Sequence, residues 1–118
     1  MRAITIPEPG EPDALVLADV PAPRAGSGEV LIDVVAAGVN RADVMQRKGF
    51  YDPPPGASPY PGLEVSGRVA GLGEGADAFA VGDEVCALLE GGGYAEQVSV
   101  PVAQVLPKPS GVDLVDAA

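Results

Sequence analysis

Glycine and proline recur along the whole chain and keep every apolar run short. The 118 residues include 16 Gly and 13 Pro, and these separate alternating apolar runs instead of forming tracts. Because neither residue is well tolerated inside a helix or strand, the elements between them must be short. With 47% hydrophobic residues in a length typical of one domain, the chain can still bury a core. The pattern predicts short strands joined by turns.

Seven segments have strand character, and the alternation is clearest in Glu29–Ala37, where Val30 and Ile32 fall on one face. We expect that segment to be an interior strand. Short strands that recur about every 8–12 residues with turn signals between them are typical of a β-barrel or sandwich. The seven predicted strands are Ala3–Ile6, Leu15–Asp19, Glu29–Ala37, Leu63–Leu72, Glu84–Leu89, Tyr94–Val100 and Val105–Pro107.

One internal helix is predicted between Asn40 and Gly49. The Asn40 side chain can cap its first turn, Asp43 stands three residues later, and Gly49 ends the segment. A second helix is predicted to begin at Asp113, with Asp113 as its N-cap. The chain stops one turn later, so we expect the 118 residues to belong to a longer protein, and a frayed natural terminus is the alternative.

Charge and composition exclude several classes of function. The net charge is −10, which argues against nucleic acid and anionic membrane as partners because both require a basic patch. The chain has no His, so catalytic triads and imidazole-bound zinc are excluded. Cys86 is the single cysteine, which precludes an intrachain disulfide and indicates a reducing compartment. Without a signal peptide or an apolar stretch of about 18 residues, we expect a cytoplasmic protein.

Two glycine-rich segments could be mistaken for phosphate sites. The segment Gly71–Ala76 matches the dinucleotide fingerprint in letters, but Gly82 breaks the chain soon afterwards, before a helix long enough to cross a sheet can form. The segment Gly91–Gly93 precedes a strand, not a helix. We therefore predict a plain turn at the first segment and a flexible hairpin turn at the second.

Six stretches of the chain together form a recognisable series. They are Ala3–Pro7, Gly28–Leu31, Ala36–Asp43, Pro61–Gly67, Val81–Val85 and Gly93–Glu96. In this order and spacing they resemble the N-terminal GroES-like domain of medium-chain dehydrogenases/reductases. That resemblance covers all 118 residues and implies a distorted, mainly β GroES-like barrel with one or two short helices. The run from Gln46 to Ala57 is similar to that of quinone reductases related to the p53-inducible member.

The resemblance also indicates the zinc-independent branch of this superfamily. Zinc alcohol dehydrogenases carry a cysteine at the position of Asn40 and a histidine at the position of Leu63. Leucine offers no lone pair, and an amide is a poor zinc ligand beside thiolate or imidazole. The resemblance therefore implies a metal-free NADPH:quinone oxidoreductase, in which hydride passes from nicotinamide to a small-molecule quinone.

The same resemblance suggests roles for four residues. Asn40 would approach the nicotinamide or its ribose as a cofactor-binding residue, and Asp43 would brace the same helix start. Tyr51 and Tyr60, on a loop that contains five prolines between residues 51 and 62, would wall the acceptor pocket and offer a phenol as hydrogen-bond donor. The alternatives are a helix cap for the first pair and packing within the loop for the tyrosines.

The Rossmann domain that holds most of NADPH in such proteins is absent from these 118 residues. We therefore expect residues 1–118 to be the substrate-side domain, inactive alone, and the intact protein to be a homodimer. Two other functions remain open at this point. The chain could belong to a medium-chain enoyl reductase, or it could be a stand-alone β-barrel used for binding or assembly.

Overall fold

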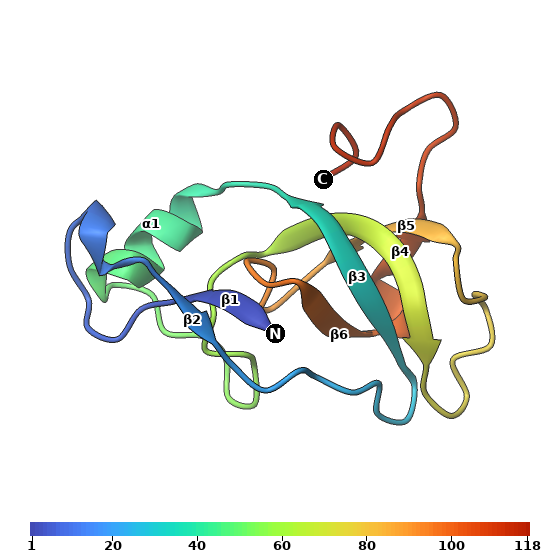
Figure 1. Ribbon diagram of the computed structural model, residues 1–118, viewed down its shortest axis with the longest axis horizontal. Helices are drawn as coiled ribbons and strands as arrows, with labels where there is room; N and C mark the ends of the chain where they lie inside the picture. The colour runs from blue at the N-terminus through green and yellow to red at the C-terminus, as the bar shows by residue number, and fades with distance from the viewer.

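The computed structural model describes all residues 1–118, and strands dominate it (Figure 1). All seven predicted strands and the predicted internal helix are present. No helix has the length and apolar character needed to cross a membrane. The elements, in order, are β1 (Arg2–Thr5), η1 (Pro12–Ala14), β2 (Val16–Asp19), β3 (Glu29–Ala37), α1 (Arg41–Lys48), β4 (Glu64–Leu72), β5 (Glu84–Leu88), β6 (Gln97–Pro101), η2 (Val102–Gln104) and β7 (Val105–Pro107).

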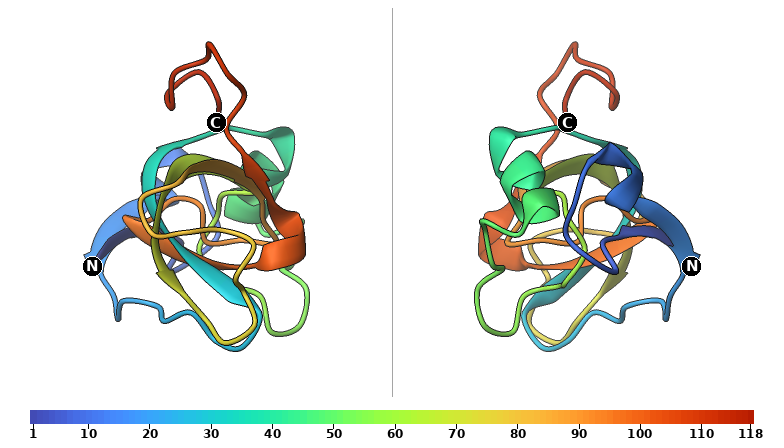
Figure 2. Two further views of the ribbon diagram at one scale, coloured as in Figure 1. Left: turned by 90° about the vertical axis from the view of Figure 1, so that its right-hand side faces the viewer. Right: turned by 90° about the vertical axis from the view of Figure 1, so that its left-hand side faces the viewer.

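The strands form two antiparallel sheets. β1 pairs with β2, and the larger sheet has the order β6-β3-β4-β5-β7. The strands at its two edges, β6 and β7, are joined directly by the single-turn helix η2. This short connection requires the sheet to curl, and Figure 2 shows its strands wrapping around a common interior. The curled sheet is a half-barrel. Within it β3 lies between β6 and β4, so it is an interior strand, as the alternation predicted.

The core fills the inside of this curl. Val30 and Ile32 of β3 share a face as predicted; both are fully buried, and they pack with valines of the other strands in a cluster of 11 buried residues. β3 and β4 approach closely at Gly67, where an added Cβ would overlap the Asp33 carbonyl oxygen. A glycine is required there because the backbones leave no room for a side chain. The core therefore depends on small aliphatic side chains and close strand contacts.

The structure corrects the predicted start of one strand. β6 begins at Gln97, not at Tyr94, because the preceding residues pair elsewhere. The Ile4 N–H donates to the Tyr94 carbonyl at 2.8 Å, and Ala3 forms an isolated bridge with Ala95. These contacts tie Tyr94 and Ala95 to β1 in the small sheet, so neither residue continues the ladder with β3.

The C-terminal segment forms a single turn and no helix. Asp113 caps that turn as predicted, since its Oδ1 accepts the Asp116 N–H at 2.8 Å. Leu114 is buried, and the buried Ser66 hydroxyl on β4 donates to its carbonyl oxygen. Because a single turn is too short to be stable as a helix by itself, the contacts with the sheet fix the segment.

The two glycine-rich segments are turns. After β4, the Gly73 N–H donates to the Glu29 carbonyl at 2.8 Å, and no helix follows, so the prediction for Gly71–Ala76 is confirmed. The segment Gly91–Gly93 is not the predicted flexible hairpin turn, because the strands on either side of it, β5 and β6, do not pair with each other. Its backbone donates to the carbonyls of Tyr60 at 2.8 Å and Gly62 at 3.1 Å, which fixes it against the proline-rich loop.

Candidate functional site

Two of the predicted site residues, Asn40 and Asp43, lie where the chain passes from β3 into α1. Asn40 is the N-cap and has an extended backbone, and Gly49 ends the helix in the left-handed conformation with φ of 84°. The Asn40 N–H donates to Asp43 Oδ2 at 2.9 Å, and the Asp43 N–H donates to the Asn40 carbonyl at 3.0 Å. This reciprocal pairing satisfies backbone donors that the first helical turn would otherwise leave free.

The Asp43 carboxylate also connects α1 to two distant segments. Its Oδ2 accepts the Tyr94 phenol at 2.8 Å, and its Oδ1 accepts the Gly62 N–H at 3.3 Å. Asp43 is only 5% exposed. A buried carboxylate is tolerated when such donors surround it. Asp43 therefore holds the helix start, the end of the proline-rich loop and the segment before β6 in one arrangement.

The environment of Tyr94 keeps its phenol protonated. Burial raises the pKa of Tyr94 well above its usual value of 10.0, and both the hydrogen bond to Asp43 and the negative charge of that carboxylate raise it further. The phenol therefore remains a donor to Asp43 to higher pH than an exposed tyrosine would. Sequence reasoning missed this partnership, because the two residues are 51 positions apart and no spacing rule connects them.

The Asn40 side chain has a charged partner on β4. Its Nδ2 donates to Glu64 Oε1 at 3.1 Å. Gly38 allows this arrangement, since a Cβ at that position would overlap the Glu64 side chain. Val39, between Gly38 and Asn40, is 80% exposed. The junction therefore presents an oriented amide next to an exposed apolar side chain.

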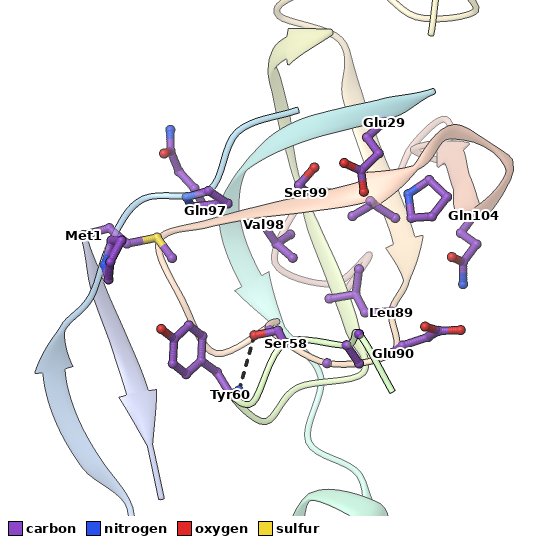
Figure 3. Close-up of a pocket in the computed structure, with 18 residues that line it drawn as sticks. Met1, Glu29, Ser58, Tyr60, Leu89, Glu90, Gln97, Val98, Ser99 and Gln104 are labelled. Carbon is purple, nitrogen blue, oxygen red and sulfur yellow. Dashed lines mark hydrogen bonds between the residues drawn. The ribbon is translucent and has the colours of Figure 1, made fainter. Parts of the chain in front are cut away.

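The structure does not bring Tyr60 together with Asn40 and Asp43. Tyr60 lines a cavity of about 300 Å³ between β6 and the Gly91–Gly92 segment, and neither Asn40 nor Asp43 is part of that lining (Figure 3). Tyr51 is half-buried near the start of the proline-rich loop, and its phenol makes no hydrogen bond to the rest of the chain. The two tyrosines thus belong to different surroundings.

The proline-rich loop is held in place by polar contacts. Gln46 of α1 donates from Nε2 to the Pro59 carbonyl at 3.2 Å, the Ala57 N–H donates to the Pro54 carbonyl at 3.0 Å, and the Tyr60 N–H donates to Ser58 Oγ at 3.3 Å. These bonds, with the restricted φ angles of the prolines, fix the shape of a loop without regular structure.

No three of the Cys, Asp and Glu side chains are grouped as they would be around a metal ion. Leu63 precedes β4 and is half-buried, next to the Glu64 that binds Asn40. The side chains that bind Asn40 therefore offer two carboxylates, Asp43 to its N–H and Glu64 to its Nδ2, and no thiolate or imidazole.

Comparisons with known proteins agree on the family of this fold. The alcohol dehydrogenase GroES-like domain family matches residues 26–110. A quinone oxidoreductase of Rattus norvegicus is 46% identical over 99 residues, which cover 81% of this chain and 30% of that protein. A synaptic vesicle membrane protein VAT-1 homolog of the same species is 37% identical over 120 residues, covering 100% of this chain and 30% of that protein.

Solved structures give the same result. The native structure of a mycobacterial protein complexed with NADPH is 38% identical, with a TM-score of 0.84 over 99% of this chain and 35% of that chain. The CurK enoyl reductase is 27% identical, with a TM-score of 0.87 over 98% of this chain and 37% of that chain. The predicted GroES-like, mainly β fold is confirmed. This chain spans about a third of the length of the proteins it matches.

Proposed function

This chain belongs to the alcohol dehydrogenase GroES-like domain family of oxidoreductases, and we propose that it is the substrate-side domain of an NADPH-dependent quinone oxidoreductase that works without zinc. The observation that carries the proposal is the junction of β3 and α1. There Glu64 holds the Asn40 amide, and Leu63 comes directly before Glu64 in the chain. Zinc alcohol dehydrogenases carry a cysteine at the position of Asn40 and a histidine at the position of Leu63. Relatives named quinone oxidoreductase support the choice of reaction.

The residues at this junction fit a nicotinamide cofactor. An oriented amide can hydrogen-bond a neutral, polar ring or its ribose, and the exposed Val39 offers apolar surface beside it. Asn40 is the cofactor contact in this proposal. Asp43 is too deeply buried for that and holds Asn40 in position through the helix start. A neighbouring structure that contains NADPH supports this choice of cofactor.

The acceptor side of the site is assigned to Tyr51. When bound, the cofactor supplies the hydride, and a quinone ring is electrophilic enough to accept it without a Lewis acid. The task of the protein is to orient the two reactants and to offer a donor to the oxygen that gains charge. The Tyr51 phenol is free of hydrogen bonds to the chain and is available as that donor. Tyr60 lies in a separate cavity, so its predicted catalytic role is not part of this proposal.

The test uses the intact protein that contains this chain and follows NADPH absorbance in the presence of a quinone. We expect turnover that a chelator does not reduce, and an Asn40→Ala variant with a KM for NADPH raised about tenfold, as the loss of one good hydrogen bond predicts. Gln97→Ala removes an amide that donates to Asp33 in the middle of β3 and to no residue of the junction, and it is the matched control. A KM unchanged by Asn40→Ala, or turnover abolished by chelation, would contradict the proposal.

A second candidate is a medium-chain enoyl reductase, which the structural similarity to the CurK enoyl reductase favours. It would use the same cofactor and the same Asn40 contact but reduce an activated carbon–carbon double bond. A panel of quinones and α,β-unsaturated thioesters, compared by kcat/KM in the intact protein, separates the two. We also propose that the intact protein is a cytoplasmic homodimer, and that residues 1–118 alone are inactive.

A further inference from the structure

The cavity that contains Tyr60 lies outside the site described above. It measures about 300 Å³, at the lower end of the range for small-molecule sites. One side is formed by β6, and the other by the Gly56–Ser58 segment, Tyr60 and the Gly91–Gly92 turn (Figure 3). Because the turn donates to the Tyr60 carbonyl, the two segments on that side are joined to each other and not to β6.

The β6 side offers backbone groups as well as side chains. Val34 donates to the Glu96 carbonyl at 2.9 Å, and Val102 donates to the Gly28 carbonyl at 2.9 Å, at the two ends of the β3–β6 ladder. Since hydrogen-bonded residues alternate along an antiparallel strand, the backbone groups of Gln97 and Ser99 face away from β3. β6 is an edge strand, so no further strand takes up these groups.

Negative charge predominates among the side chains that line the cavity. Glu29 and Glu90 both belong to the lining, and neither forms an ion pair. No Lys or Arg contributes to the cavity. The Met1 ammonium is the one cation there, and it donates to the Val20 carbonyl at 2.8 Å. The cavity therefore has two carboxylates without a basic side chain to neutralise them, which favours a ligand of positive charge.

The remaining lining is apolar or aromatic. Leu89, Val98 and Val100 contribute core side chains, and the Tyr60 ring forms a wall. The Tyr60 ring lies across the cavity from Glu29 and Glu90 (Figure 3), so the ring and the apolar side chains favour a ligand whose charged group is carried on a hydrocarbon body. We propose that this cavity binds a small organic cation, in which a protonated amine is carried on an apolar or aromatic group.

The test is a titration of the chain with benzylamine, followed by two-dimensional ¹H–¹⁵N NMR at physiological salt. Benzyl alcohol, of the same shape but neutral, is the reference ligand. We expect the amide signals of Gly91, Gly92 and Ser99 to shift, and benzylamine to bind about tenfold more tightly than benzyl alcohol, as a charge-assisted contact predicts. Equal affinities, or shifts scattered over the acidic surface, would overturn the proposal.

Matched variants test the role of the carboxylates. Glu29→Gln removes the charge but keeps an oxygen for the Gly26 N–H, which Glu29 Oε1 accepts at 2.9 Å. Glu90→Gln removes the second charge at an exposed position. Each variant should lower the preference for benzylamine over benzyl alcohol severalfold. Glu8 is an exposed carboxylate away from the cavity, so Glu8→Gln should leave that preference unchanged. An equal loss in all three variants would show only general attraction to an acidic protein and would refute a defined site.

Discussion

At the scale of single residues, the arrangement of the candidate site depends most on Asp43. It is a short side chain with two oxygens, and these accept hydrogen bonds from Asn40, Tyr94 and Gly62, which lie in three separate segments. Its burial makes each of these contacts costly to lose, because the donors left behind have little access to water. Asp43 thus connects the local cap of one helix to the tertiary structure around Asn40.

Replacing Asp43 tests that role directly. We expect Asp43→Ala to lower the free energy of unfolding by about 2–4 kcal/mol, since it leaves the Tyr94 hydroxyl and two backbone N–H groups without their acceptor. Tyr94→Phe removes only one of the three bonds and should cost about 1 kcal/mol. Urea denaturation at constant m-value measures both. Equal costs for the two variants would contradict a role for Asp43 beyond its bond to Tyr94.

The raised pKa of Tyr94 predicts how stability changes in alkaline solution. The unfolded phenol ionises near pH 10.0, whereas burial and Asp43 keep the folded phenol protonated to higher pH. The unfolded state therefore loses its proton first, so stability is fully present below pH 10 and falls as pH rises above it. Urea midpoints measured from pH 8 to pH 11 should show this fall, and Tyr94→Phe should reduce its slope while Tyr51→Phe should not.

At the scale of elements, the sequence predicted those that depend on local patterns. The alternation in Glu29–Ala37 defined β3 to the residue, and Asn40, Asp43 and Gly49 marked both ends of α1. The predicted start of β6 was wrong because Tyr94 bonds to Ile4, which is remote in the sequence, and this contact decides where the strand begins. The same limit applies to the site, since cap residues can be read locally but a partner 51 positions away cannot.

Glycines in β4 give a test of packing between elements. An added Cβ at Gly67 would overlap the Asp33 carbonyl and lie 2.8 Å from Ile32 Cγ2, whereas one at Gly71 would lie 3.7 Å from Leu31 Cβ. We expect Gly67→Ala to cost about 3 kcal/mol or more, as overpacking against backbone does. Gly71→Ala should be neutral or stabilise by about 0.5 kcal/mol. The melting temperatures of both variants, measured by thermal unfolding, test this difference. Similar melting temperatures would contradict the close approach of β3 and β4.

At the scale of the whole molecule, charge opposes the compact fold. The net charge is −10, yet only two ion pairs form, Arg2–Glu96 at 2.9 Å and Arg68–Glu84 at 3.3 Å, and both are exposed. Exposed pairs contribute little, about 0–1 kcal/mol each. Most of the 17 acidic side chains therefore repel one another across a surface of 6473 Å². Repulsion of this kind destabilises a folded protein more than its expanded, unfolded chain.

Salt should therefore stabilise this protein. Raising the NaCl concentration from about 0.01 M to 0.15 M shortens the Debye length from about 30 Å to about 8 Å, so distant carboxylates no longer interact. The same screening weakens the two ion pairs, but these are few and act over short distances. We expect the melting temperature to rise over this range, and to rise less in the double variant Glu74→Gln, Asp77→Asn, which removes two exposed charges from one turn. A melting temperature that falls with salt would mean that the ion pairs outweigh the repulsion and that the excess negative charge does not limit stability.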